Sequence, residues 1–443
     1  MTPVRFLAAA LVLLVSQKGP GWAAEVVAFD LRRTAHAVHG FGVTFWASDD
    51  LGDLERVFRE LNIRFGRTPR GFYEDCHDEA GYDAYWRGYE DWERIKQRWD
   101  LARRCGVKMT LTGWNYPPQW ISAVGESIAG HADEYAAMWA SLVRAYADRG
   151  MKPYAILFGE ESECPGTRQY PMWIAPEEYC DLLKRTRQAL NRRGLADVRI
   201  MAPGCAHLDM EAGNPWVEAL DPAAVATLSA WATHGYLFGE RGTAQLRAAW
   251  AKLTGAIARK DPGRRRPVFV TEYESLSDEP FGTVAWAVRQ YADTLEHLNA
   301  GAAGTWYFSA CGPLGGNSLI RNGVPALSFY CLKTLYPVIP VGARVLPPQG
   351  QPADFSCAAF VRGRRLVVAL ANPSARRLSP VVRLSGVAQL RVTEALAFTG
   401  DPGAEVRPGE ADVRERGLGE WVLRPVLPPL STLTIVCDAT PTP

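Results

Sequence analysis

Between Val38 and about Leu335 the sequence alternates short apolar runs with longer amphipathic stretches. Eight of the apolar runs are candidate β-strands, and helix-like patterns separate most of them. This alternation is typical of repeated βα units around a parallel sheet. We therefore predict an α/β fold, a (β/α)8 TIM barrel over residues 38–337. The candidate strands are residues 38–46, 62–67, 107–113, 154–159, 198–204, 227–236, 267–273 and 303–309.

The clearest helical pattern covers residues 175–194. Pro176 lies near its start and Gly194 follows its end, which is the usual placement of these two residues at helix termini. Apolar side chains recur at helical spacing, so one face of this helix is expected to pack on the barrel. The residues of that face are Tyr179, Leu182, Leu183, Thr186 and Leu190.

Beyond Val341 the pattern changes to short β-prone runs separated by Gly, Pro and Asn, without helical periodicity. This change predicts a C-terminal β-sandwich domain over residues 338–443. Residues 25–37, ahead of the first barrel strand, contain a further β-prone segment at 26–31 that is a candidate to join the same sandwich.

Residues 1–24 follow the pattern of a secretory signal peptide. Arg5 precedes an apolar run over residues 6–15, and small residues follow before Glu25. The apolar run is too short to span a bilayer. We expect a secreted or periplasmic protein that has no membrane contact once the leader is removed.

Composition narrows the choice of partner. A net charge of +1 without long Lys/Arg runs gives no electrostatic footprint for nucleic acid. Fifteen Trp and sixteen Tyr suit a protein that packs aromatic rings on sugars, so a carbohydrate substrate is expected. Nine scattered Cys show no metal-ligand spacing, and Cys76 with His77 forms no recognised ligand set. The sequence therefore predicts no metal and no cofactor.

Two of the predicted strands end in glutamates: Glu160, Glu161 and Glu163 follow one, and Glu272 and Glu274 lie at the end of another. Catalytic groups of TIM barrels sit where strands end, and two facing carboxylates are the machinery that cleaves a glycosidic bond. Glycoside hydrolysis is the leading hypothesis. Glu163 and Glu274 are interpreted as loop residues, and adjacent Glu160 and Glu161 are expected to project to opposite sides. A cation such as calcium is an alternative ligand for this acidic cluster.

The chain resembles the clan A glycoside hydrolases, and most of all family 30 and its relatives of the glucosylceramidase and xylanase type. The resemblance covers nearly the whole mature chain and rests on the order of short motifs along it. Those motifs are HGFG (39–42), RTP (67–69), WNYPPQW (114–120), EESE (160–163), HGY (234–236), TEY (271–273), GTWYF (304–308) and the ending LPPLSTLTI.

The resemblance implies that Glu161 is the general acid/base and Glu272 the nucleophile of a retaining enzyme. Their carboxyls would then lie about 5–5.5 Å apart. Arg67 matches an arginine that ends the family's second strand and is expected to hydrogen-bond the nucleophile and keep its pKa low.

The resemblance also implies a set of substrate-binding residues. His234 and Tyr236 match the pair on the sixth strand, with Tyr236 able to touch the nucleophile. Trp306 matches the ring that forms the floor of the sugar subsite, and Trp114 is a candidate for its wall.

One departure from the family leaves open which glutamate is the acid and whether the protein is active. The family has Asn immediately before the acid/base, where it binds the sugar 2-hydroxyl, and this chain has Glu160 there and Ser162 in place of the following Pro. Either the 2-position contact is altered, or the register shifts and Glu160 is the acid. A catalytically impaired carbohydrate-binding barrel is the alternative function. A metal-dependent hydrolase and a serine esterase rank below it, because the His are scattered and no GxSxG motif is present.

Overall fold

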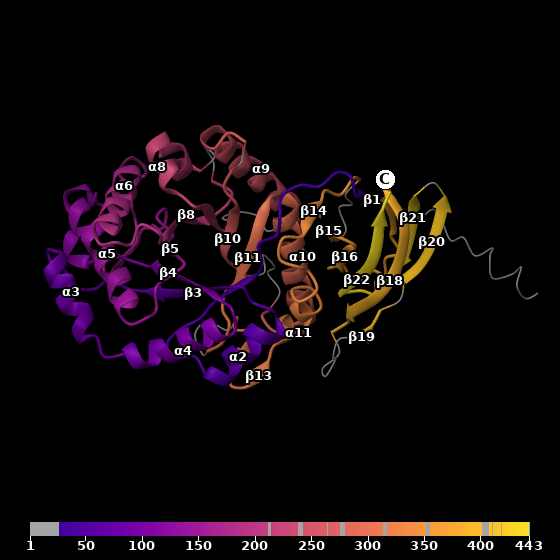
Figure 1. The fold of residues 1–443 in the computed structure, drawn as a ribbon, viewed down its shortest axis with the longest axis horizontal. Coiled ribbons are helices and arrows are strands. Elements are labelled where there is room, and N and C mark those ends of the chain that lie inside the picture. Colours follow the sequence, from indigo (N-terminus) through magenta and orange to yellow (C-terminus); the bar gives the residue numbers. More distant parts are fainter. Residues whose placement is uncertain are drawn as a thin grey trace, which may run out of the picture.

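The computed structural model of the chain describes residues 26–442, except for 211–213, 238–241, 264, 275–279, 313–316, 351–354, 401–406, 410 and 418. The leader predicted over residues 1–24 lies outside the described residues. Figure 1 shows a barrel of strands and helices with a β domain beside it. None of the helices in the described part of the chain has the length and apolar character needed to cross a bilayer.

Eight parallel strands close into a barrel. Each of the eight predicted apolar runs contributes one strand, which confirms the TIM-barrel prediction, and neighbours in sequence are neighbours in the barrel. The strands are β2 (Gly42–Thr44), β3 (Phe65–Arg70), β4 (Lys108–Gly113), β5 (Ala155–Leu157), β8 (Arg199–His207), β9 (Ala230–Tyr236), β10 (Val268–Tyr273) and β11 (Ala302–Tyr307).

Helices cover the outside of the barrel. In α6, all five residues of the predicted apolar face are buried and Pro176 occupies the first helical position. The helices are α2 (Leu51–Glu60), α3 (Glu79–Gly88), α4 (Trp92–Arg104), α5 (Ala132–Asp148), α6 (Pro176–Arg192), α7 (Pro215–Ala219), α8 (Pro222–Thr227), α9 (Thr243–Lys260), α10 (Val284–Ala300) and α11 (Leu327–Lys333). Short elements in the connections are the 3-10 turns η1 (Pro118–Trp120) and η2 (Ala129–His131) and the hairpins β6 (Gly166–Thr167) with β7 (Tyr170–Pro171) and β12 (Ile320–Arg321) with β13 (Val324–Pro325).

The inside of the barrel is filled by side chains. Trp306 lies there with its ring centroid 5.6 Å from that of Phe65 and 5.9 Å from that of Phe269. Gly42 leaves the room for this indole, because a Cβ at that position would lie 2.5 Å from the Trp306 ring. The barrel is therefore a packed core that supports the site at the ends of its strands.

The C-terminal domain is a sandwich of two sheets, as predicted. Both sheets contribute to one apolar core, in which Phe29, Val382, Leu366 and Ile435 are fully buried. One sheet consists of β14 (Arg344–Leu346), β15 (Ser356–Arg362), β16 (Arg365–Asn372), β22 (Ser431–Pro441), β18 (Val387–Phe398) and β19 (Arg407–Pro408). The other consists of β1 (Val26–Asp30), β17 (Val381–Ser385), β21 (Glu420–Pro425) and β20 (Ala411–Gly417), and β1 pairs in parallel with β17.

The two domains share a buried interface. Helix α10 lies between the barrel strands and the sandwich (Figure 1). The Tyr291 hydroxyl of α10 is 2.5 Å from the Thr434 hydroxyl of β22, and the Asn299 amide donates to the carbonyl of Cys357 at 2.7 Å. Phe360 and Val367 of the sandwich belong to the apolar cluster of the barrel. The sandwich is therefore an integral support of the barrel.

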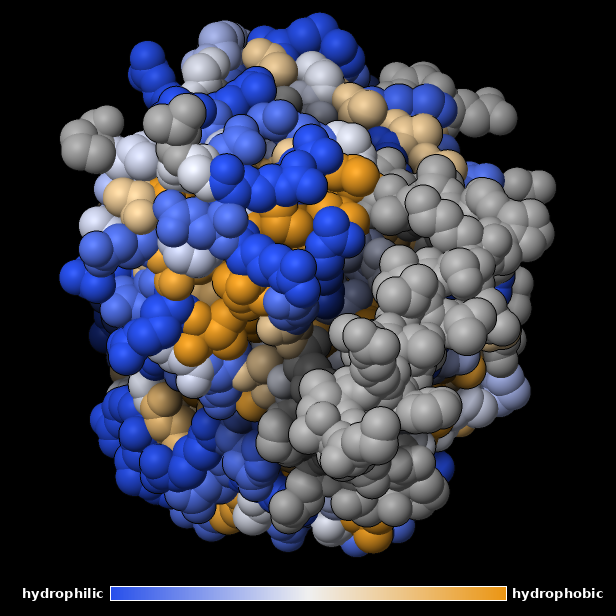
Figure 2. Space-filling view, turned by 90° about the vertical axis from the view of Figure 1, so that its right-hand side faces the viewer, coloured by the Kyte–Doolittle hydropathy of each residue, from blue (hydrophilic) through white to orange (hydrophobic). Residues whose placement is uncertain are grey.

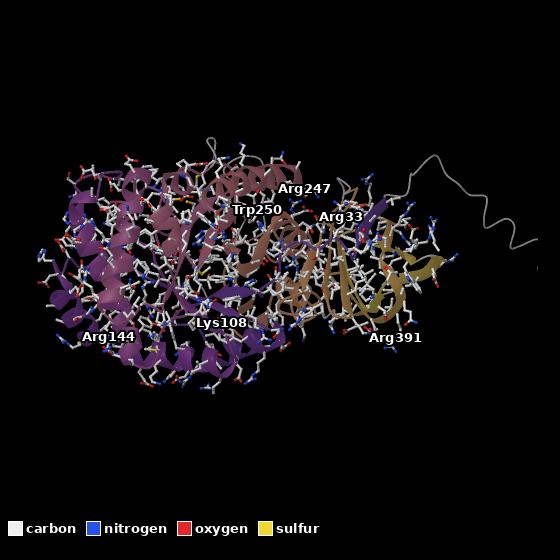
Figure 3. All side chains as sticks on the ribbon, turned by 45° about the horizontal axis from the view of Figure 1, so that its top comes forward. Arg33, Lys108, Arg144, Arg247, Trp250 and Arg391 are labelled. Atoms are coloured by element: carbon white, nitrogen blue, oxygen red, sulfur yellow. The ribbon has the colours of Figure 1, made fainter. Side chains whose placement is uncertain are left out.

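The surface agrees with the balanced charge of the sequence. The coloured part of the face in Figure 2 is mostly hydrophilic, with apolar patches between the hydrophilic groups. Cationic side chains such as Arg144, Arg247 and Arg391 are spread over both domains (Figure 3).

Candidate active site

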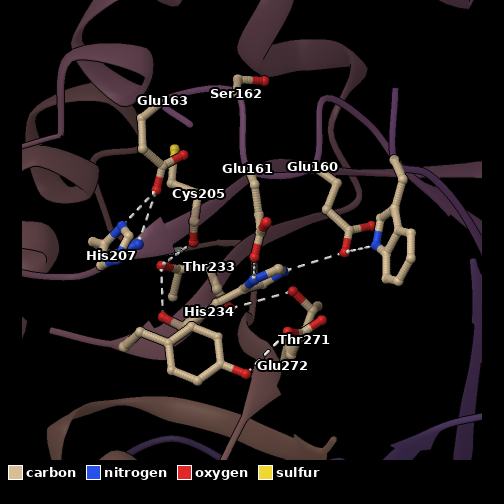
Figure 4. A network of polar contacts seen from close by, with 12 residues as sticks. Glu160, Glu161, Ser162, Glu163, Cys205, His207, Thr233, His234, Thr271 and Glu272 are labelled. Atoms are coloured by element: carbon tan, nitrogen blue, oxygen red, sulfur yellow. Dashed lines mark hydrogen bonds and ion pairs between the residues drawn. The ribbon is translucent and has the colours of Figure 1, made fainter. Parts of the chain in front are cut away.

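The carboxyl ends of five barrel strands bring the predicted site residues other than Trp306 together, and Figure 4 shows the glutamates and His234 among them. Because all strands are parallel, residues far apart in sequence meet at one end of the barrel. Arg67 comes from β3, Glu160 and Glu161 follow β5, His234 and Tyr236 end β9, Glu272 lies on β10 and Trp114 follows β4.

Arg67 is the centre of the cluster. Its guanidinium is fully buried and forms ion pairs with both Glu160 and Glu272. The same group donates a hydrogen bond to the backbone carbonyl of Thr271 at 3.1 Å. One cation therefore compensates two buried carboxylates, an arrangement that holds only while these contacts stay in place.

Glu272 is held as a carboxylate. Burial acts to raise its pKa, but Arg67, His234 and the Tyr236 hydroxyl outweigh burial, so the pKa is lowered. The Tyr236 hydroxyl donates to Glu272 Oε1 at 2.9 Å. The side chain keeps a small exposed fraction, which leaves it open on one side. This is the state that a carboxylate nucleophile requires.

Glu160 is completely buried. Its Oε1 accepts a hydrogen bond from the Trp114 indole at 2.9 Å in addition to the ion pair with Arg67, and its Oε2 has no hydrogen-bond partner. Burial raises the pKa of Glu160 to about 7, and the attraction of Arg67 and His234 offsets only part of that effect. Glu160 therefore exchanges its proton near neutral pH.

Glu161 points to the same site as Glu160, which corrects the expectation that the two project to opposite sides. Strand β5 ends at Leu157, and positive φ angles of 63° at Gly159 and 51° at Glu161 turn the chain, so strand alternation no longer applies. Glu161 Oε1 lies 3.3 Å from His234 Nδ1, and its side chain is 24% exposed. Of the two adjacent glutamates, Glu161 is the one that solvent and a ligand reach.

His234 connects the carboxylates. It is fully buried, with Nδ1 on Glu161 and Nε2 3.9 Å from Glu160 Oε1. Burial acts to lower its pKa, but Glu272 and Glu161 outweigh burial and raise it. The imidazole therefore gains a proton more readily than it would in the same buried place without these carboxylates.

Trp306 is not at the surface of the site, contrary to the prediction that its ring forms a sugar floor. Its side chain is fully buried inside the barrel, in the apolar cluster that contains Phe65 and Phe269. The rings at the rim belong instead to Trp46, Trp114 and Phe308: Trp46 packs edge-on against Trp114 at 5.5 Å and against Phe308 at 5.7 Å. Sequence analysis did not single out Trp46 and Phe308, although both stand at the ends of predicted strands.

The remaining glutamates lie apart from this cluster. Glu163 faces His207, whose backbone N–H donates to Glu163 Oε1 at 2.9 Å, and Glu274 accepts a hydrogen bond from Asn317. Within the cluster itself, ligand atoms of Glu160, His234 and Glu272 lie within 4.8 Å of one another. Arg67 already binds both carboxylates, so this group fits an ion-pair network better than a cation site.

The Glu160→Gln variant is expected to gain stability relative to wild type as the pH is raised from 5 to 8. A buried carboxyl whose pKa is raised from 4.5 to about 7 contributes its full stability below pH 4.5 and loses it as pH rises through 7, a cost of up to about 3 kcal/mol. Urea unfolding of wild type and variant at pH 5 and pH 8 measures the effect. A difference that stays constant between the two pH values would contradict the assignment.

No protein-family model and no curated protein matches this sequence. Solved structures do match it. A glycoside hydrolase family 30 subfamily 8 xylanase from Clostridium acetobutylicum has a TM-score of 0.71 at 15% identity, covering 94% of this chain and 100% of that chain. A family 30 endoxylanase from Clostridium papyrosolvens has a TM-score of 0.70 at 17% identity, with the same coverage of both chains. A family 51 α-L-arabinofuranosidase from Bifidobacterium longum has a TM-score of 0.64 at 15% identity, again with the same coverage. The chain therefore has the fold of these glycoside hydrolases, as the order of its sequence motifs predicts.

Proposed function

We propose that the protein is an exported, retaining glycoside hydrolase that cleaves β-glycosidic bonds of oligo- or polysaccharides by double displacement. The observation that carries this proposal is the pair of carboxyls at His234: Glu272, kept ionised by Arg67, and Glu161, which is partly exposed. Retaining glycosidases need one carboxylate that attacks and one carboxylic acid that donates.

In the first step, Glu161 gives its proton to the glycosidic oxygen while Glu272 attacks the anomeric carbon and forms a glycosyl ester. In the second step, Glu161 takes a proton from water, and the water oxygen replaces Glu272 at the same carbon. Tyr236 and Arg67 hold the Glu272 oxygens, so they orient the attacking lone pair and lower its basicity.

Exposure supports Glu161 rather than Glu160 as the acid/base. The raised pKa of Glu160 by itself suits an acid. A proton donor must reach the leaving oxygen, however, and geometry takes precedence over pKa in choosing it. Glu160 is sealed beneath Arg67 and Trp114, whereas Glu161 is open. We therefore assign Glu160 to the support of Arg67.

Aromatic residues around the site support a carbohydrate substrate. Tyr73, Trp114 and Tyr170, on the loops after β3, β4 and β5, are 46%, 36% and 52% exposed. Tyr73 and Tyr170 form an edge-on pair with centroids 5.9 Å apart. Exposed rings at the end of the barrel that carries the carboxylates offer faces on which sugar C–H groups pack.

A fluorinated glycosyl fluoride series tests the proposal. The 2-fluoro sugar slows the second step, so a labelled protein should accumulate, and fragmentation of the labelled peptide should place the sugar on Glu272. Turnover of a matching aryl β-glycoside is expected with the same sugar. A label on Glu274, or neither label nor turnover with any sugar, contradicts the proposal. Affinity for oligosaccharides without turnover would instead support a catalytically impaired carbohydrate-binding barrel.

The Tyr170→Ala variant is expected to bind long substrates more weakly and short substrates as well as wild type does. If Tyr170 packs on a distal sugar, its loss should raise KM for oligosaccharides by roughly five- to tenfold and leave a monosaccharide aryl glycoside unchanged. Initial rates over a series of chain lengths measure the effect. Val124→Ala, a truncation at another exposed loop residue, is the control. Equal losses on long and short substrates would argue against a sugar contact at Tyr170.

A further inference from the structure

Three side chains with metal-ligand atoms lie together behind the proposed acid/base. Glu163 and Cys164 belong to the loop after β5, and His207 ends β8. One ligand atom from each of the three lies within 4.8 Å of the ligand atoms of the other two. The three residues take no part in the proposed reaction.

The carboxyl group of Glu163 gives a second indication of a ligand at this place. Its side chain is only 5% exposed, and the two carboxyl oxygens differ. Oε1 accepts the His207 backbone N–H at 2.9 Å and lies 3.4 Å from His207 Nδ1. Among the described residues, no donor lies within hydrogen-bond distance of buried Oε2, and the buried Cys205 thiol is a further neighbour of this carboxyl. A buried acceptor left without a partner is costly, and such an atom calls for an unseen ion or water.

The donor set indicates which ion fits. A thiolate, an imidazole and a carboxylate are the ligands of zinc, whereas calcium and magnesium prefer oxygen ligands alone. Zinc–ligand bonds of about 2.0–2.3 Å in a tetrahedron put the ligand atoms about 3.3–3.8 Å apart. A contraction of about 1.5 Å at most brings the three atoms to that spacing.

We propose that Glu163, Cys164 and His207 form a zinc site beside the active site, with its fourth position open to water. This site goes beyond the proposed function and does not depend on it. It has one structural consequence for the neighbouring glutamates: the Cys164 N–H donates to the carbonyl of Glu161 at 2.7 Å, so a zinc ion on Cys164 would restrain the turn that carries Glu161.

Metal binding by the purified full chain tests the site directly. After dialysis against a chelator, the protein is titrated with zinc chloride by calorimetry. Wild type is expected to bind one zinc ion, and Cys164→Ser and Glu163→Gln to bind it at least about tenfold more weakly. Cys105→Ser, which removes a cysteine of similar partial burial at the end of α4, is the matched control and should bind like wild type.

Cobalt substitution gives a readout that needs no variant to fold. A Co²⁺-loaded wild-type chain is expected to show the near-ultraviolet charge-transfer absorption of a thiolate ligand, and the band should be lost in Cys164→Ser. No metal uptake by wild type, no such band, or equal uptake by wild type and folded Cys164→Ser would overturn the proposal. Because neither measurement involves turnover, its failure is distinguishable from failure of the glycosidase assignment.

Discussion

A chain carrying Glu272→Gln is expected to lose kcat for aryl glycosides by roughly 10⁴-fold or more, because an amide cannot form the glycosyl ester. Glutamine keeps the size and one acceptor oxygen of the side chain, so the contact with the Tyr236 hydroxyl survives. Arg67 also retains Glu160 as a partner. The loss should therefore appear in turnover, with little change in the thermal unfolding midpoint, and both quantities are measured on the same preparation.

The variants of the adjacent pair complete this test. Glu161→Ala should still form the glycosyl ester from a substrate whose leaving group needs no proton, and added azide should then speed the second step and yield a β-glycosyl azide. Glu160→Ala should show no such rescue, since its side chain is sealed from the ligand. Azide rescue of Glu160→Ala in place of Glu161→Ala would show that the acid sits one residue earlier.

Arg67→Met is expected to lower the free energy of unfolding by about 3–5 kcal/mol near pH 8, because it leaves two buried carboxyls without their cation. The cost should shrink toward acid pH. Glu272 owes its lowered pKa chiefly to Arg67, which opposes burial, so the stabilisation from that pair is present above the unfolded pKa of 4.5 and is lost as pH falls through the folded pKa.

Urea unfolding at pH 8 measures the size of this effect, and the same experiment below pH 4.5 measures its direction. The control is Arg259→Met, which breaks an ion pair with Glu218 on the surface. Exposed pairs contribute about 1 kcal/mol or less, so this variant should stay close to wild type. If Arg67→Met costs no more than the control, the buried cluster does not hold charge as described.

Periodicity was sufficient to predict the architecture. The eight apolar runs became the eight barrel strands because parallel strands buried on both faces need continuous apolar residues. Helix α6 kept its apolar face because only that face meets the barrel. The short β-prone runs after Val341 became the sandwich for the same kind of reason.

The details of the site depend on features that spacing does not encode. The two adjacent glutamates both face the site because left-handed backbone at Gly159 and Glu161 breaks the strand alternation. Trp306 lies inside the barrel because the layer a strand residue occupies depends on strand tilt and on the space left by Gly42. Glu163 and His207 come from the loop after β5 and from the end of β8, and the spacing of residues in the sequence does not predict that they lie together.

The parallel pairing of β1 with β17 ties the beginning of the described chain to its last quarter. Ser385 donates to the carbonyl of Phe29 across 356 positions of sequence. During synthesis this sheet stays incomplete until nearly the entire polypeptide has left the ribosome. A truncation near residue 338 would likewise leave Val27 and Phe29, both buried in the sandwich, exposed to water. An excised barrel would have to lose residues 26–37 together with the sandwich to behave as an independent unit.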